Sequence, residues 1–184
     1  MSPPRLLALC GSLRNDSFNK KLLALAVAEA RAQGAEVDVV EDKALGQLPL
    51  YDQDVEAQGW PAPIKDLRER MARAQGLLIS SPEYNSSIPG VLKNALDWMS
   101  RPPERVFQNK WAAIMGASPG MFGTARMQPH LRQTLASMNM NVVTTQVHTP
   151  RAMEALTSEG HFKDEARNKE LAALVTALVS KLKG

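Results

Sequence analysis

The 184-residue sequence has a single cysteine, Cys10, and only three histidines. One thiol cannot form an internal disulfide, and without a second cysteine or clustered histidines the sequence offers no structural zinc site. His130, His148 and His161 form no i, i+4 pair, so we expect no metal site. Cys10 precedes Gly11 and is interpreted as a small buried hydrophobe rather than a redox thiol. These features favour a reducing cytoplasm.

Long hydrophobic runs and blocks of like charge are also missing. No segment approaches the roughly 18 apolar residues of a membrane-spanning helix. The apolar stretch at residues 6–9 is too short for a signal peptide. Lys and Arg total 22 against 19 Asp and Glu, but they are dispersed along the chain, so nucleic-acid binding is unsupported. We therefore expect a cytoplasmic protein that binds neither membrane nor nucleic acid.

The composition is that of an ordinary globular protein, with 44% hydrophobic and 22% charged residues. A chain of this length buries about 70% of the surface that its unfolded form exposes, which provides a full hydrophobic core. We expect one domain over residues 1–184.

Short apolar runs alternate with helical patterns along the whole chain. The runs predict strands at residues 5–10, 37–40, 77–79, 111–115 and 142–145, and the 3.6-residue periodicity predicts helices at 17–33, 64–74, 92–99, 127–138 and 165–182. Residues 42–63 show no sustained period and are predicted to form a long surface loop, and residues 151–163 are not assigned. This alternation indicates a three-layer α/β/α sandwich on a five-stranded parallel sheet in the flavodoxin-like order 2-1-3-4-5. Ligands of such folds bind outside the carboxyl ends of the strands.

The first loop at that edge joins the first strand to a helix and reads Gly-Ser-Leu-Arg-Asn-Asp-Ser-Phe-Asn over residues 11–19. Free backbone N–H groups, the helix dipole, the Ser12 and Ser17 hydroxyls and the Arg14 guanidinium would suit a phosphate. The alternative is that Asp16 or Ser17 is a helix N-cap and Arg14 is solvated. The Asp16 carboxylate would oppose a phosphate unless it points away.

The second loop, residues 80–90, is restrained at both ends by Pro82 and Pro89. It could present backbone groups to a planar heterocycle, with Tyr84 stacking on it or walling the pocket. The alternative is a plain connection capped by Ser87. The third loop, residues 117–126, contains two glycines that allow close approach to a ligand, although alone it reads as an ordinary turn before a helix.

Taken together, these motifs resemble the NADPH-dependent FMN reductase family of flavodoxin-like proteins, which includes quinone, chromate, azo and ferric reductases. The resemblance covers residues 6–138. It is carried by the first loop, by Ser-Pro-Glu-Tyr-Asn at 81–85 with Ile-Pro-Gly at 88–90, by Lys-Asn-Ala-Leu-Asp-Trp at 93–98, and by Leu-Tyr-Asp-Gln-Asp at 50–54. In the third loop, Pro119 and Met121-Phe122 depart from the family pattern, whereas residues 123–126 are similar to it.

The resemblance implies an FMN site. Ser12, Arg14, Ser17 and Asn19 would cradle the FMN phosphate, Pro82 to Asn85 would line the isoalloxazine, and Ser118 with the glycine loop after it would close one end of the ring. The full set of implied cofactor-binding residues is Gly11, Ser12, Leu13, Arg14, Ser17, Phe18, Asn19, Pro82, Glu83, Tyr84, Asn85, Ser118 and Gly120.

The implied function is an NAD(P)H-dependent FMN oxidoreductase. NADH or NADPH would pass hydride to flavin N5, and one site would then deliver electrons to quinones, chromate, ferric chelates, azo compounds or free flavin. No side chain is expected to act as a catalytic residue, because the chemistry belongs to the flavin. The resemblance also implies a homodimer or homotetramer, and Trp60 and Phe122 could be exposed at its interface or packed in the core.

Two other functions stay open at this point. A flavodoxin-type electron carrier would bind FMN without using a pyridine nucleotide, but such carriers are generally acidic and this sequence has a pI near 9.1. A binding module that has lost its cofactor is disfavoured by the intact loop motifs. Neither the physiological acceptor nor the choice between NADH and NADPH follows from these residues.

Overall fold

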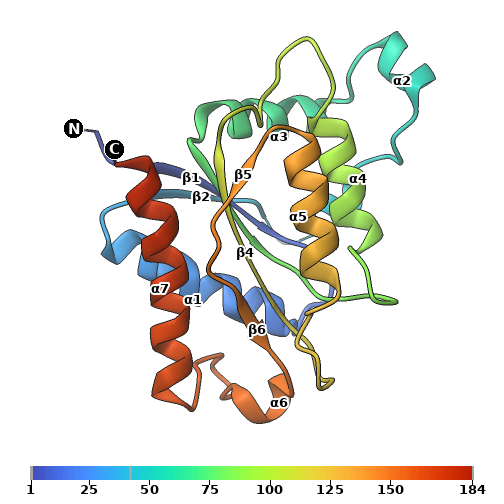
Figure 1. The fold of residues 1–184 in the computed structure, drawn as a ribbon. Helices are drawn as coiled ribbons and strands as arrows, with labels where there is room; N and C mark the ends of the chain where they lie inside the picture. Colours follow the sequence, from blue (N-terminus) through green and yellow to red (C-terminus); the bar gives the residue numbers. More distant parts are fainter. Residues whose placement is uncertain (1, 42, 184) are drawn as a thin grey trace.

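The computed structural model describes residues 2–41 and 43–183 (Figure 1). Its parallel sheet has the order β2-β1-β3-β4-β5, and a sixth strand, β6, also pairs with β4. The predicted flavodoxin-like order is therefore confirmed. The strands are β1 (Arg5–Cys10), β2 (Glu36–Val39), β3 (Gly76–Ser80), β4 (Trp111–Ala117), β5 (Asn141–Val142) and β6 (Val147–Thr149).

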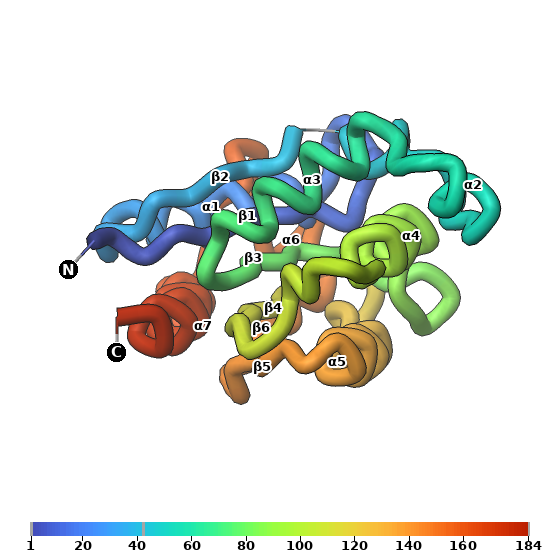
Figure 2. The backbone as a smooth tube through the Cα atoms, turned by 90° about the horizontal axis from the view of Figure 1, so that it is seen from above, coloured from blue at the N-terminus to red at the C-terminus, as the bar shows by residue number. Residues whose placement is uncertain are grey.

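Helices cover both faces of the sheet, as the view along it shows (Figure 2). One face packs against α1 (Phe18–Ala32) and α7 (Glu165–Leu182). The other packs against α3 (Ala62–Arg73), α4 (Gly90–Met99) and α5 (Met127–Ser137). The five predicted helices are thus all present.

The sheet separates two cores because successive side chains of a strand point to opposite faces. In β1, Leu7 and Leu9 belong to the core under α3, α4 and α5, whereas Leu6 and Ala8 belong to the core under α1 and α7. All four are essentially inaccessible to solvent. Burying each leucine contributes about 1.5–3 kcal/mol, so the continuous apolar runs in the sequence fix the central strands between two helical layers.

The segment predicted as an irregular loop is more ordered than expected. It contains a 3-10 helix, η1 (Ala44–Gln47), and a short helix, α2 (Gln53–Gln58), while Asp42 lies outside the described residues. The side chain of Asn94 on α4 donates to the carbonyl oxygen of Pro49 (2.9 Å) and accepts from the Tyr51 N–H (2.8 Å). Trp98 also donates to Pro49 (2.8 Å). These bonds hold the segment against α4.

The last predicted strand, residues 142–145, is wrong in its extent. Only Asn141 and Val142 pair with the start of β4, and the chain then shifts before β6 pairs with the end of the same strand. Arg132 donates to the carbonyl oxygens of Val143 (2.8 Å) and Thr145 (3.4 Å), so a side chain takes the place of sheet bonds there. The unassigned segment beyond β6 contains the short helix α6 (Ala152–Ala155).

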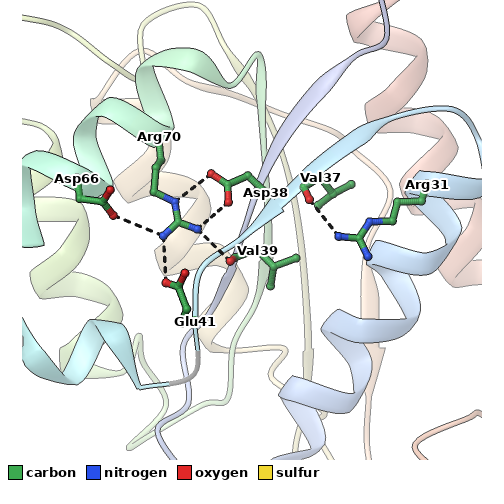
Figure 3. A network of polar contacts seen from close by, with 7 residues as sticks. All are labelled: Arg31, Val37, Asp38, Val39, Glu41, Asp66 and Arg70. Atoms are coloured by element: carbon green, nitrogen blue, oxygen red, sulfur yellow. Dashed lines mark hydrogen bonds and ion pairs between the residues drawn. The ribbon is translucent and has the colours of Figure 1, made fainter.

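The edge strand β2 is tied to α3 by a polar network around Arg70 (Figure 3). The Arg70 guanidinium donates to both carboxylate oxygens of Asp38 (2.9 and 2.7 Å), to Glu41 (3.1 Å) and to the Val39 carbonyl oxygen (2.9 Å). The bond to Arg70 lowers the pKa of Asp38 and raises that of Arg70, while a backbone hydrogen bond, followed by the bond to Arg70, lowers the pKa of Glu41; burial opposes each shift. Within residues 2–41 and 43–183, no helix has the length and apolarity needed to cross a bilayer.

Candidate functional site

Three loops meet where β1, β3 and β4 end. The Gly11 N–H donates to the Ser80 carbonyl oxygen (2.9 Å), and the Ser81 N–H donates to that of Met115 (3.1 Å). The first loop therefore lies beside the second, and the second beside β4. This is the edge of the sheet at which the topology predicts a ligand.

The first loop has the geometry of an anion site. Ser17 is the N-cap of α1 and its hydroxyl oxygen accepts from the Asn19 N–H (3.2 Å), while the Ser12 hydroxyl oxygen accepts from the Arg14 N–H (3.3 Å). Both serines are buried. The first turn of a helix also carries N–H groups without intrahelical partners, and its dipole favours negative charge. Capping and anion binding are compatible here, since a hydroxyl that accepts one bond can still donate another.

Asp16 does not oppose an anion in this loop. Its carboxylate forms an ion pair with Lys21 (2.7 Å), and its side chain is 79% exposed. The hydrogen bond and charge of Lys21 lower the pKa of Asp16. The carboxylate is therefore paired with a cation in the first turn of α1.

Asn19 joins the first loop to the end of β4. Its buried side-chain amide donates to the Ala117 carbonyl oxygen (2.9 Å), and its amide oxygen accepts from the Ala117 N–H (2.9 Å) and the Ser80 hydroxyl (3.2 Å). The amide thus bonds both the N–H and the C=O of Ala117, as the backbone of a neighbouring strand would. Its contacts are with protein groups, and they fix the helix start against two strands.

The remaining first-loop residues differ in exposure. Arg14 is exposed, and its guanidinium lies 5.1 Å from the centre of the Phe18 ring. Leu13 is partly buried and packs so closely on Gly46 that a Cβ there would come 2.8 Å from Leu13 Cδ1. Gly11 is restricted in the same way, because a Cβ would come 2.5 Å from Ser81 Oγ. A larger residue at Gly11 would push the first two loops apart.

The second loop contains a tight turn. The Tyr84 N–H donates to the Ser87 carbonyl oxygen (3.1 Å) and the Ser87 N–H donates to that of Tyr84 (3.0 Å). Asn85 and Ser86 have φ values of 48° and 63°, as the two central residues of a type I′ turn require. Pro82 is buried, and Tyr84 is 52% exposed. The loop therefore presents an aromatic ring on a fixed backbone.

Glu83 connects the second loop to the third. Its carboxylate accepts from the backbone N–H groups of Arg126 and Met127, both at 3.0 Å. These groups lie at the start of α5, where a negative charge is favourable. The Glu83 carboxylate thus caps α5, and the contact of this residue with a flavin ring stays a prediction.

The third loop packs on β6. The Ser118 N–H donates to the Thr149 carbonyl oxygen, and the Ala152 N–H donates to that of Ser118, both at 3.0 Å. Gly120 is exposed and accepts from the Arg151 N–H (3.0 Å). The backbone at Ser118 and Gly120 is thus held by hydrogen bonds with the end of β6 and with the residues that follow it.

Arg126 is a residue of this region that the sequence analysis did not single out. Its guanidinium lies 4.1 Å from the centre of the Phe122 ring and donates to the Ser86 hydroxyl oxygen (2.9 Å). It therefore links the second and third loops at their solvent side. Only its place after the two glycines of the third loop could have drawn attention to it.

The structure also locates three other residues that the sequence analysis discusses, Phe122, Trp60 and Cys10. Phe122 is 56% exposed, whereas Trp60 is partly buried against the core and lies under the Arg68 guanidinium at 4.0 Å. Cys10 is partly buried and packs against the core beneath α1 and α7. In the described part of the chain, no three His, Cys, Asp or Glu side chains are grouped so as to hold a metal ion.

Comparisons with known proteins give a consistent result. The family model described as NADPH-dependent FMN reductase matches residues 4–154. The NAD(P)H-dependent FMN reductase PA1204 of Pseudomonas aeruginosa is 39% identical over 184 residues, covering 98% of this chain and 97% of its own. The 2-hydroxy-1,4-benzoquinone reductase of a Burkholderia species is 45% identical over 137 residues, or 74% and 72% of the two chains.

A solved structure agrees over nearly the full length. FerB, a flavoenzyme NAD(P)H:(acceptor) oxidoreductase from Paracoccus denitrificans, superposes with a TM-score of 0.87 and 31% identity. The alignment covers 98% of this chain and 97% of FerB. The similarity therefore includes all three loops.

Proposed function

Because the chain belongs to the NADPH-dependent FMN reductase family, we propose that it is an FMN-dependent oxidoreductase that oxidises NADH or NADPH and reduces small-molecule acceptors, quinones among them. The observation that carries the proposal is the meeting of three loops at the carboxyl ends of β1, β3 and β4, with an anion-binding helix start at their centre. FMN, when bound, supplies hydride acceptance and electron transfer.

The residues of the first loop fit the phosphate of FMN. Ser12 and Ser17 are buried hydroxyls beside the start of α1, and Arg14 is an exposed cation on the same loop. We assign these three side chains, with the N–H groups of the first helical turn, to the phosphate. Asn19 has a positioning role, because its amide fastens this loop to Ala117.

The second and third loops would hold the ring system. We assign the backbone from Pro82 to Asn85 to the isoalloxazine, supported by the turn that fixes it, and the backbone at Ser118 and Gly120 to one end of the ring. Fixed N–H dipoles directed at a ring that gains negative charge favour its electron-rich form. Glu83 acts through α5, which it caps.

The reductase is favoured over a flavodoxin-type carrier. Relatives that align over nearly the whole chain are named as NAD(P)H-dependent enzymes, and the chain is basic, with a net charge of +3. Chromate, ferric chelates, azo compounds and free flavin are further acceptors to test, since an open ring face does not select among them.

We further propose a cytoplasmic homodimer or homotetramer. The lone Cys10 suits a reducing compartment. Several large apolar side chains are exposed on the single chain, among them Leu50 (82%), Met121 (73%) and Phe122 (56%), and association would cover such groups.

Anaerobic reduction tests the proposed function directly. The protein is reconstituted with FMN, freed of unbound flavin and mixed with NADH or NADPH while the oxidised-flavin absorbance is recorded. Rapid bleaching is expected with at least one nucleotide. Retained FMN that neither nucleotide bleaches would establish the carrier instead.

A further inference from the structure

The edge strand β2 directs part of its backbone away from the sheet. The N–H groups of Glu36 and Val40 donate to carbonyl oxygens on the β1 side of the strand, at 2.8 and 3.0 Å. Alternate residues of a strand point their N–H and C=O groups to opposite sides. Val37 and Val39 therefore point theirs outward, on the side where, among the described residues, the strand order of the sheet ends.

This edge has the properties of a strand that can pair with another molecule. Its sequence, Glu-Val-Asp-Val, contains two β-branched residues that favour extended structure, and Val39 is 37% exposed. An open edge presents N–H and C=O groups without strand partners, and these are a template for an extended strand of a second copy. Natural proteins keep such edges from pairing with charged side chains, bulges or a covering element.

Two arginine side chains occupy the outward carbonyl groups of β2 (Figure 3). Arg31, in the last turn of α1, donates to the Val37 carbonyl oxygen (3.1 Å). Arg70, in the last turn of α3, donates to that of Val39 (2.9 Å). Because α1 and α3 cover opposite faces of the sheet, the two guanidinium groups reach the strand from both faces. An added strand would therefore meet a charged side chain at both acceptors that its own N–H groups need.

The Arg70 guanidinium is fixed in its position at the edge. It donates to both carboxylate oxygens of Asp38, at 2.9 and 2.7 Å, and to Glu41 at 3.1 Å, and its side chain is only 10% exposed. Asp38 belongs to β2 itself, so the strand holds the arginine that covers its neighbouring carbonyl group.

Arg31 reaches the edge without such an ion pair. Its side chain is exposed, and in residues 2–41 and 43–183 no carboxylate lies within 4.0 Å of its guanidinium. Ion pairing accounts for the position of Arg70 but not for that of Arg31. What the two arginines share is a bond to an outward carbonyl group of the same strand.

We propose that Arg31 and Arg70 together close the β2 edge: by occupying the carbonyl oxygens of Val37 and Val39, they prevent a strand of a second copy from adding to the sheet. The inference goes beyond the proposed function and does not depend on it, since neither arginine lies in the three loops. It also limits the proposed homo-oligomer, whose copies then associate through surfaces other than this edge.

The test measures the association of the FMN-loaded full chain carrying Arg31→Met and Arg70→Met. Methionine keeps an unbranched side chain but has no hydrogen-bond donor. Sedimentation equilibrium over a series of protein concentrations gives the weight-average mass, in NaCl at about 0.5 M, which screens repulsion between the acidic side chains left at the edge. The mass of this double variant is expected to reach at least about twice that of wild type, because each copy has one such edge and edges join in pairs.

The matched control carries Lys65→Met and Arg73→Met. Both residues are exposed cations on α3, and Arg73 pairs with Glu69 at 3.9 Å. The control therefore loses the same charge and gains the same apolar groups as the double variant. Its mass should equal that of wild type.

A proline on the edge identifies the surface through which the double variant associates. Val39→Pro removes no bond to β1, because the Val39 N–H points outward, and proline offers no N–H to a new strand. Adding this change to the double variant is expected to restore the wild-type mass.

A folded double variant with the mass of wild type would overturn the proposal. An equal rise in the control, or a rise that Val39→Pro leaves unchanged, would do the same. If circular dichroism shows that the double variant does not fold, Arg31→Met with Arg70→Lys replaces it, since lysine keeps a cation beside Asp38 but lacks the planar fork of arginine. The same rise is expected there, and its absence overturns the proposal.

Discussion

At the scale of single residues, Asp16 shows how a carboxylate can lie in a loop proposed to bind an anion while it pairs with a cation. The sequence places it between Arg14 and Ser17, and the structure directs it to Lys21 at 2.7 Å. An ion pair so exposed adds little stability. Its effect is to balance the negative charge of Asp16 with a cation from the first turn of α1.

The first prediction concerns FMN retention. Arg14→Ala is expected to raise the dissociation constant for FMN by about tenfold or more, because it removes a charge-assisted bond to the phosphate. Hydride transfer in the fully loaded variant should change less than the affinity does. Fluorescence titration with FMN measures the first quantity, and anaerobic stopped-flow absorbance measures the second.

Asp16→Asn is the matched control for this loop. Since the Asp16 carboxylate points to Lys21, its neutralisation should shift FMN affinity by less than Arg14→Ala does. If the hydride-transfer rate of fully FMN-loaded Arg14→Ala fell by the same factor as its FMN affinity, the assignment of Arg14 to the phosphate would be refuted.

Two glycines allow a second prediction, on stability. A Cβ at Gly116 would collide with the Ser81 backbone oxygen and the Thr124 side chain, whereas Gly90 has open space around it at the start of α4. Gly116→Ala is expected to lower the free energy of unfolding by about 1–3 kcal/mol, as overpacking does. Gly90→Ala should be neutral or stabilising by up to about 1 kcal/mol. Urea denaturation measures the free energy of unfolding of both variants. Equal free energies for Gly116→Ala and Gly90→Ala would contradict the close packing at Gly116.

Single-residue roles were the least predictable part of the site. The position of the first loop and the N-cap at Ser17 follow from local sequence, because the interacting atoms are two residues apart. The bonds of Asn19 to Ala117 and of Glu83 to Arg126 and Met127 span 98, 43 and 44 residues. No local pattern contains such a partner, so the sequence could not predict these bonds; the cofactor contacts of Asn19 and Glu83 stay predictions.

At the scale of elements, the helices and strands that have a buried face are the ones that the sequence predicts. The central strands and five helices have buried faces, and the resulting periodicity appears in the sequence. Helix α2 has six residues and none is buried, so it leaves no such pattern. The division between β5 and β6 depends on Arg132, which bonds across to Val143 and Thr145.

The Arg70 network supports a third prediction, on the pH dependence of stability. The pKa of Asp38 is lowered mainly by its hydrogen bond to Arg70. A carboxylate whose pKa is lower in the folded state adds stability above its unfolded pKa, near 3.9, and this stability is lost as pH falls through the folded value. Asp38→Asn should therefore destabilise at neutral pH, and its difference from wild type should shrink below about pH 4. Urea unfolding across a pH series measures this difference.

Glu69→Gln is the control for that series. Glu69 forms an exposed i, i+4 pair with Arg73 at 3.9 Å, and pairs of this kind contribute little. A difference between Asp38→Asn and wild type that persisted unchanged at the lowest pH would show that the Asp38 ion pair is not its source.

At the scale of the whole molecule, the three loops proposed to hold the flavin lie together at one edge of one sheet. Nicotinamide and acceptor would therefore occupy the same position in turn. The fourth prediction is that double-reciprocal plots are parallel when NAD(P)H and quinone are varied together. Steady-state rates over a grid of both concentrations provide the measurement, and intersecting lines would require both substrates to bind at once.

The bond between the Asn19 amide and Ala117 has a consequence for the order in which the site forms during synthesis of the chain. It joins residues 98 positions apart, so the first loop cannot be fastened to β4 while Ala117 is still inside the ribosome, although its bonds to Ser80 on β3 can form earlier. The segment proposed to bind the phosphate is made early, whereas its support on β4 is synthesised about a hundred residues later. A site completed by this bond would therefore capture FMN only after more than half of the polypeptide has been synthesised.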